Sequence, residues 1–198
     1  MNVIYLGRVE ALHRFVRRAN EVLVNTQFYE RISKHVDFDY TEEKPGHIAG
    51  WIKQSTLTVK VKLYKPKDPD TITTAYVSSN YPNTIFINSY RLNRGTGKLV
   101  NTIIHEGVHA VDRSLPGKRF GHGDNRWQGK QNSAPYWIGK LAERIINGVK
   151  AEDDHSIVEN EIEVMEGCGD IEESGKIFDD NLYDEELKDL DKKLEKVD

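Results

Sequence analysis

The sequence has little cysteine and no long apolar run. Its 198 residues contain one cysteine, Cys168, which excludes an intramolecular disulfide framework and a zinc site made of cysteines alone. No uninterrupted apolar stretch approaches the roughly 20 residues of a membrane-spanning helix. Residues 1–18 carry four arginines and lack the continuous apolar stretch of a signal peptide. We therefore expect a cytoplasmic protein with no membrane segment.

Positive and negative charges are distributed unevenly along the chain. The formal net charge is −4, but residues 1–150 hold 23 lysines and arginines against 13 acidic residues, whereas residues 151–198 hold 5 against 19. A split of this size indicates a basic domain followed by an acidic tail. We predict that residues 151–198 form a separate appendage, partly helical or mobile. It would keep the chain soluble, contact a basic partner or fold back to cover the basic domain.

Apolar periodicity predicts an α+β domain in residues 1–150. Helical spacing covers 8–24, 28–35, 99–111 and 137–146, and strands are predicted at 57–64, 72–77 and 84–88. Gly95-Thr96-Gly97 is too short for a phosphate-binding loop and is expected to shape the entry to the third helix, while Ser133 is a suitable N-cap for the fourth. A helix, a small mixed sheet, a second helix, a long loop and a further helix make an α+β fold. In the tail, short helices are predicted at residues 157–165 and at the seam of Leu187, Leu190, Leu194 and Val197.

The motif His105-Glu106-Gly107-Val108-His109 carries the clearest chemical signal. Residues four apart lie on one face of a helix, so both imidazoles can reach a single ion. Imidazole nitrogen is a good zinc ligand, and the adjacent glutamate can act as the general base that activates a water. The apolar helix around the motif and the strands before it are the setting that this motif requires. We therefore predict one catalytic Zn²⁺ held by His105 and His109, with Glu106 as the general base.

A catalytic zinc commonly has a third protein ligand, and the sequence leaves several candidates. The position six residues beyond His109 is Leu115, which excludes the metzincin arrangement. His122 is the favoured ligand because it lies 13 residues beyond His109, in a loop whose glycines permit close approach of the backbone. The alternatives are the carboxylates of Asp112, Asp124 and Glu143, of which Asp112 is better placed to orient a histidine than to bind the ion.

These residues resemble the SprT-like (Spartan) family of zinc metallopeptidases. The resemblance covers residues 95–150 and consists of His105-Glu106-x-x-His109-Ala110, a short loop, Gly121-His122-Gly123 and an aromatic residue soon after. It implies a zincin-like domain in which His105, His109 and His122 bind zinc and Glu106 is the catalytic base. It also implies that any DNA binding would serve proteolysis.

Two further features are expected of a zincin-type enzyme. The strand before the active-site helix typically pairs with extended substrate, which assigns Thr84, Ile85, Phe86, Ile87 and Asn88 to the edge of the sheet. The attacked carbonyl also needs a hydrogen-bond donor besides zinc. Tyr136, Arg126 and Tyr90 are the candidate donors by their positions in the sequence.

Three functions are compatible with the sequence. The first is zinc-dependent hydrolysis of peptide bonds in a protein or peptide substrate. The second applies the same chemistry to a non-protein amide, such as cell-wall peptide. The third is a non-catalytic nucleic-acid-binding module, because a basic domain attracts backbone phosphates. Scattered basic residues without a pattern of stacking aromatics argue against the third function.

Overall fold

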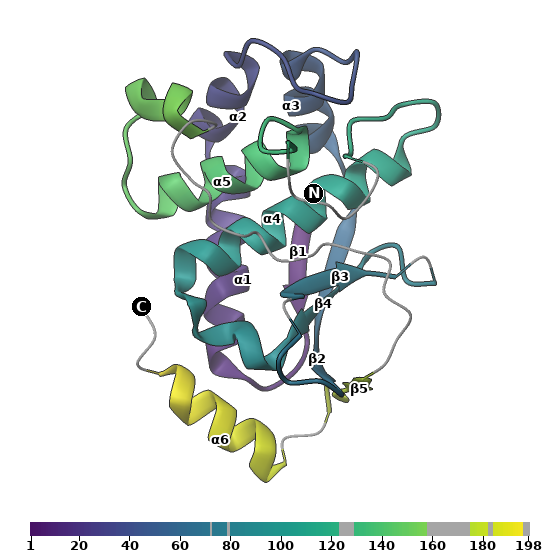
Figure 1. Cartoon of the computed structure of the whole chain (residues 1–198), viewed down its shortest axis with the longest axis vertical. Helices are drawn as coiled ribbons and strands as arrows, with labels where there is room; N and C mark the ends of the chain where they lie inside the picture. Colours follow the sequence, from purple (N-terminus) through teal and green to yellow (C-terminus); the bar gives the residue numbers. More distant parts are fainter. Residues whose placement is uncertain (72, 79, 123–128, 158–174, 182–183, 196–198) are drawn as a thin grey trace.

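The computed structural model describes residues 1–198 apart from 72, 79, 123–128, 158–174, 182–183 and 196–198. The described residues form a mixed α+β fold, as predicted (Figure 1). The helices are α1 (Glu10–Val24), α2 (Thr26–Ser33), α3 (Pro45–Gln54), η1 (Ser89–Arg94), α4 (Thr96–Ser114), α5 (Ala134–Ile146), η2 (Ala151–Ile157) and α6 (Glu185–Leu194). The strands are β1 (Asn2–Tyr5), β2 (Thr58–Pro66), β3 (Ala75–Val77), β4 (Thr84–Asn88) and β5 (Gly175–Ile177). No helix among these residues is both long and apolar enough to cross a membrane.

The strands form one mixed sheet in the order β1-β2-β4-β3, with β5 paired to the far end of β2. β1, β2 and β4 are parallel, whereas β3 runs antiparallel to β4. The prediction that Thr84–Asn88 forms the sheet edge is therefore wrong, because β4 pairs with a strand on each side. All five side chains of β4 are buried, which is typical of an interior strand. The strand beyond β4 is β3.

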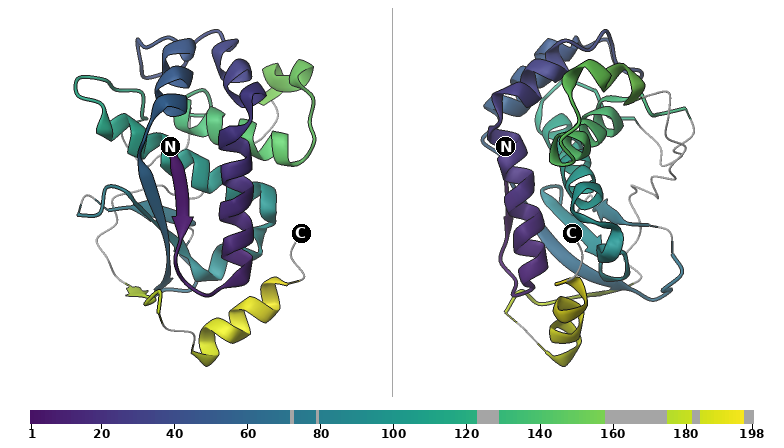
Figure 2. Two further views of the ribbon diagram at one scale, coloured as in Figure 1. Left: turned by 180° about the vertical axis from the view of Figure 1, so that it is seen from behind. Right: turned by 90° about the vertical axis from the view of Figure 1, so that its left-hand side faces the viewer.

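The helices cover one face of the sheet. On that face Val59, Val61, Ile85 and Ile87 join the main hydrophobic core together with the apolar residues of α1, α4 and α5. Tyr64, Tyr76 and Phe86 form a small second cluster apart from that core. In Figure 1, α4 runs diagonally in front of α1 and β1, and the view from behind in Figure 2 reverses that order. The core thus surrounds α4, the helix that carries the metal-binding motif.

α4 and α5 pack closely and run in opposite directions. Near the start of α4, Gly97 faces Asn147, whereas Gly139, near the middle of α5, faces Asn101 and His105. A Cβ atom at Gly139 would lie 2.4 Å from Oδ1 of Asn101 and 3.1 Å from Cβ of His105. Glycine at this position therefore allows α5 to approach the first motif histidine.

The described part of the acidic tail is not a separate appendage. β5 extends the sheet, and Phe178, Leu187 and Leu194 are buried in the same core as the basic domain. α6 contains the three leucines of the predicted seam, whereas Val197 and residues 158–165 of the other predicted tail helix lie outside the described residues. Asp191 of α6 accepts hydrogen bonds from the backbone N–H groups of Glu10 and Ala11, at 3.1 Å each. The N-cap residue of α1 is Val9, whose side chain cannot accept such bonds. Asp191 therefore caps a helix that lies 180 residues earlier in the chain.

Candidate metal centre

α4 buries the whole His-Glu-x-x-His motif. The exposed fractions are 0% for His105, 1% for Glu106 and 9% for His109. The apolar residues of α4 that surround the motif draw the helix into the core, since Ile103, Ile104 and Val108 are fully buried. The apolar helix that the sequence predicts around the motif is therefore present and largely buried.

His122 reaches the two motif histidines from the loop after α4. Its Nε2 lies 2.9 Å from Nε2 of His109 and 3.4 Å from Nε2 of His105. The three histidines offer ligand atoms that all lie within 4.8 Å of one another. Two nitrogens bound to one tetrahedral zinc ion would be about 3.3 Å apart. The spacing of these nitrogens therefore fits three ligands of a single metal ion.

The environment of the histidines favours their neutral, metal-binding form. Burial lowers the pKa of His105 well below its usual 6.5, and the nearby His109 and His122 lower it further. Burial also lowers the pKa of His109 well below 6.5, with His122 adding to the effect. Neutral imidazoles have a lone pair available for a metal ion near neutral pH. The chemistry of the donor set thus agrees with its geometry.

Asp112 fixes the loop that carries His122. Its Oδ1 accepts a hydrogen bond from the backbone N–H of Phe120 at 2.8 Å, two residues before His122. Burial raises the pKa of the Asp112 carboxyl, and this hydrogen bond opposes the rise. A Cβ atom at Gly121 would lie 3.1 Å from Oδ2 of Asp112 and 3.2 Å from Nδ1 of His109, so a side chain there would crowd both groups. Asp112 therefore acts on the loop backbone, outside the group of three histidines.

Lys130 holds the same loop from its other side, a role that the sequence analysis missed. The Lys130 ammonium donates a hydrogen bond to the backbone carbonyl of His122 at 3.0 Å and is buried. It also lies 5.9 Å from the centre of the Tyr40 ring. One lysine in a polar, glycine-containing loop has no sequence pattern that would distinguish it, because its partner is a backbone oxygen.

Tyr136 is the predicted hydrogen-bond donor that lies beside the histidines. Its ring centre is 4.5 Å from that of His105 and 4.8 Å from that of His122. The position of Tyr136 near the start of α5 explains this contact, because α5 begins beside the middle of α4. The tyrosine is buried and forms one wall of the candidate centre.

Other predicted residues lie elsewhere. The Glu143 carboxylate accepts hydrogen bonds from Asn101 at 2.9 Å and Lys140 at 3.1 Å, and it is outside the cluster of histidines. The Tyr90 ring lies 5.9 Å from the ammonium of Lys65, near the end of β2. Asp124 and Arg126 are outside the described residues.

Comparisons with known proteins give no information about the candidate metal centre. The chain matches no family model, no curated protein and no solved structure. The observations that bear on function are therefore the three converging histidines, the buried Glu106 and the residues that hold them.

Proposed function

We propose that this chain is a zinc-dependent hydrolase of peptide bonds with a zincin-like catalytic domain resembling the SprT-like metallopeptidases. The observation that carries the proposal is the convergence of His122 on the two histidines of the His-Glu-x-x-His motif. Three imidazoles are a common catalytic zinc ligand set, which leaves a coordination position for water or substrate. The glutamate that follows the first histidine distinguishes a hydrolytic centre from a structural one.

In this proposal His105, His109 and His122 hold the zinc ion, and Glu106 moves the proton. Zinc, when bound, supplies a Lewis acid and lowers the pKa of water at the centre. Glu106 accepts the proton of the attacking water and returns it to the leaving amine. Tyr136 lies against two of the ligands and donates a hydrogen bond to the negative charge that develops on the carbonyl oxygen.

The sheet edge for extended substrate in this proposal is β3 instead of β4. β3 is the last strand of the path β1-β2-β4-β3 and pairs with β4 along its inner side. A peptide that added to its outer side would form main-chain hydrogen bonds independent of side-chain sequence. Such a mode suits a peptide substrate better than a compact amide.

The proposal is tested with Glu106→Gln, which keeps the shape of the side chain and removes its basicity. We expect hydrolysis to fall at least a hundredfold, because general base catalysis contributes about 10²–10⁴ in rate. The zinc content, measured by elemental analysis, should stay at the wild-type level. Casein and murein zymography of the wild type would separate a peptidase from an amidase that acts on cell-wall peptide.

Glu143→Gln is the matched control, since Glu143 is also a buried glutamate but lies outside the histidine cluster. It should retain its zinc and hydrolyse substrate within a few-fold of the wild-type rate. Full hydrolysis by the zinc-loaded Glu106→Gln variant would overturn the mechanism. A wild-type protein that binds no zinc would overturn the proposal as a whole.

A further inference from the structure

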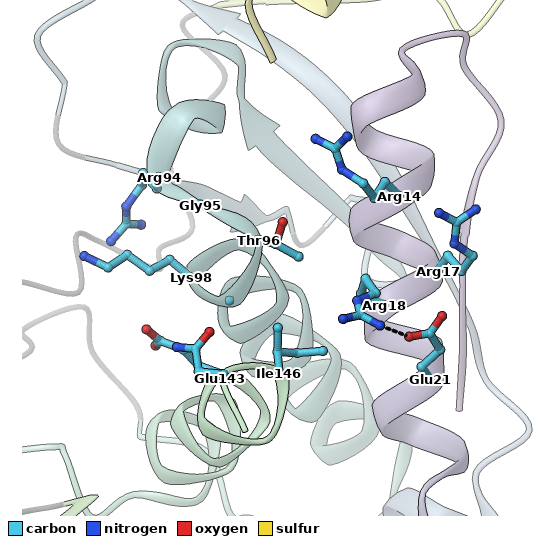
Figure 3. Close-up of a pocket in the computed structure, with 12 residues that line it drawn as sticks. Arg14, Arg17, Arg18, Glu21, Arg94, Gly95, Thr96, Lys98, Glu143 and Ile146 are labelled. Atoms are coloured by element: carbon cyan, nitrogen blue, oxygen red, sulfur yellow. Dashed lines mark hydrogen bonds and ion pairs between the residues drawn. The ribbon is translucent and has the colours of Figure 1, made fainter. Parts of the chain in front are cut away.

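A cavity of about 620 Å³ lies between α1, the start of α4 and the end of α5 (Figure 3). Its lining includes five cationic side chains, Arg14, Arg17, Arg18, Arg94 and Lys98. Lys98 precedes His105 by seven residues, which corresponds to about 10 Å along a helix. The cavity is therefore apart from the candidate metal centre and shares α4 with it.

The two carboxylates in the lining already have cationic partners. Glu21 pairs with Arg18 at 2.7 Å, as Figure 3 shows. Glu143 pairs with Lys140 at 3.1 Å, and Lys140 lies outside the lining. Five cations and two carboxylates leave the lining with a formal charge of +3. The cavity is thus a concentrated positive region in a chain whose overall net charge is −4.

The fold orients Arg94 without neutralising it. Nη1 of Arg94 donates a hydrogen bond at 2.8 Å to Oγ1 of Thr74, a neutral acceptor. A guanidinium has five N–H donors, so further donors remain for an anion. In Figure 3 the Arg94 and Lys98 side chains extend in a common direction from η1 and the first turn of α4. A held guanidinium beside an ammonium is an arrangement suited to phosphate oxygens.

The beginning of α4 adds backbone donors to these side chains. The N-cap residue is Gly95, with φ of 89°, and glycine has no side chain to accept hydrogen bonds from the first N–H groups. Thr96 and Gly97 follow in the lining of the cavity. The amino end of a helix attracts anions through its N–H groups and its dipole. The arginine side chains remain the main source of positive charge.

We propose that this cavity binds a small anion with two or more phosphate groups. Its volume is within the roughly 300–1,000 Å³ of small-molecule sites. Arg94 and Lys98 lie on one side of the start of α4 and the α1 arginines on the other, so a ligand that reaches both sets needs more than one charged group. The described lining contains no aromatic ring, so a nucleic-acid strand would lack a surface on which its bases could stack. The site recognises phosphate and needs no hydrolytic function at the metal centre.

The test is a titration of the zinc-loaded protein with inorganic pyrophosphate at about 50 mM NaCl, followed by NMR of the amides of Gly95, Thr96 and Gly97. In the wild type the NMR chemical shifts of these amides should change as pyrophosphate is added and reach a plateau when the site is full. The double variant Arg18→Gln/Arg94→Gln should bind at least tenfold more weakly. Arg14 stays intact because it donates a hydrogen bond to the carbonyl of Leu194 and supports α6. If the double variant does not fold, the exposed Arg18→Gln alone should give a smaller loss of the same kind.

The matched control is Arg8→Gln/Arg119→Gln, which removes two exposed charges outside the lining. Its affinity for pyrophosphate should stay within twofold of the wild type. Equal losses in both double variants would indicate a general charge effect and overturn the site, as would the absence of shifts at Gly95–Gly97 in the wild type. Shifts caused by duplex DNA but not by pyrophosphate would also overturn it. Zinc analysis after the titration must show that pyrophosphate has not removed the metal; shifts that appear only with zinc loss count against the site.

Discussion

The two ends of α4 provide opposite environments for charge. Around His105, Glu106 and His109 the helix is buried, and the histidines are held neutral. At Thr96–Lys98 the same helix begins beside a partly exposed cavity with an excess of cations. A buried set of neutral imidazole nitrogens suits a metal cation, whereas a cluster of arginines suits an anion. One continuous helix therefore positions two sites of opposite preference.

The largest effect that tests this comparison is expected for His122→Ala. Loss of one of three ligands should weaken zinc binding by about a hundredfold or more, since partners that only orient a ligand already change metal affinity by about 10–100-fold. The affinity is measured by competition with a chromophoric chelator. Binding of pyrophosphate at the other end of α4 should stay within twofold. Conversely, Arg94→Gln should weaken pyrophosphate binding and leave zinc affinity within twofold. If either variant disrupted both sites, the two ends of the helix would not be independent.

Protonation should also distinguish the two ends of α4. The fold lowers the pKa values of His105 and His109 below 6.5. Between pH 6.5 and these lowered pKa values, the unfolded chain therefore binds more protons than the folded chain. The stability associated with the neutral histidines is present above about pH 6.5 and is lost as pH falls below it. The free energy of unfolding of metal-free protein should therefore decrease by roughly 1 kcal/mol per pH unit for each histidine over this range.

The measurement is urea unfolding of chelator-treated protein at pH 7.5 and pH 5.5. His105→Gln/His109→Gln should reduce the loss of stability on acidification. Arg18→Gln/Arg94→Gln should leave it unchanged, because arginine does not titrate in this range. An equal loss in all three proteins would show that the histidines do not cause the pH dependence.

Local features of the candidate centre could be predicted from the sequence, and long-range ones could not. The motif on α4 has a fixed spacing, and the glycines beside His122 indicated a loop able to approach it. The roles of Asp112 and Lys130 depend on the backbone atoms of Phe120 and His122, which no residue pattern reveals. The sequence therefore predicted the ligands and an orienting role for Asp112, but neither the backbone N–H that Asp112 binds nor the role of Lys130.

The same distinction between local and long-range features applies to the helices and strands of the fold. Four predicted helices correspond to α1, α2, α4 and α5, each of which carries a buried apolar stripe. α3 was missed because Pro45, Gly46 and Gly50 reduce its helical signal, although proline is well tolerated in the first turn. β1 was missed because it has only four residues, too few to show a clear alternation of apolar and polar positions. β5 and the docking of α6 depend on partners more than 100 residues away, such as Lys65 for Glu186.

The smallest of these effects is expected for Asp112→Ala, which tests how much of the metal centre depends on its loop. The substitution removes the acceptor for the Phe120 amide and leaves all three histidines in place. Partners that hold ligands typically change metal affinity by about 10–100-fold, and we expect the lower end of this range because Lys130 still holds the carbonyl of His122. Asp112→Asn retains an acceptor oxygen and should restore most of the affinity, measured by the same chelator competition. If Asn and Ala weakened zinc binding equally, the negative charge of Asp112 would matter more than its hydrogen bond. If neither did, the loop would be fixed by Lys130 and by packing alone.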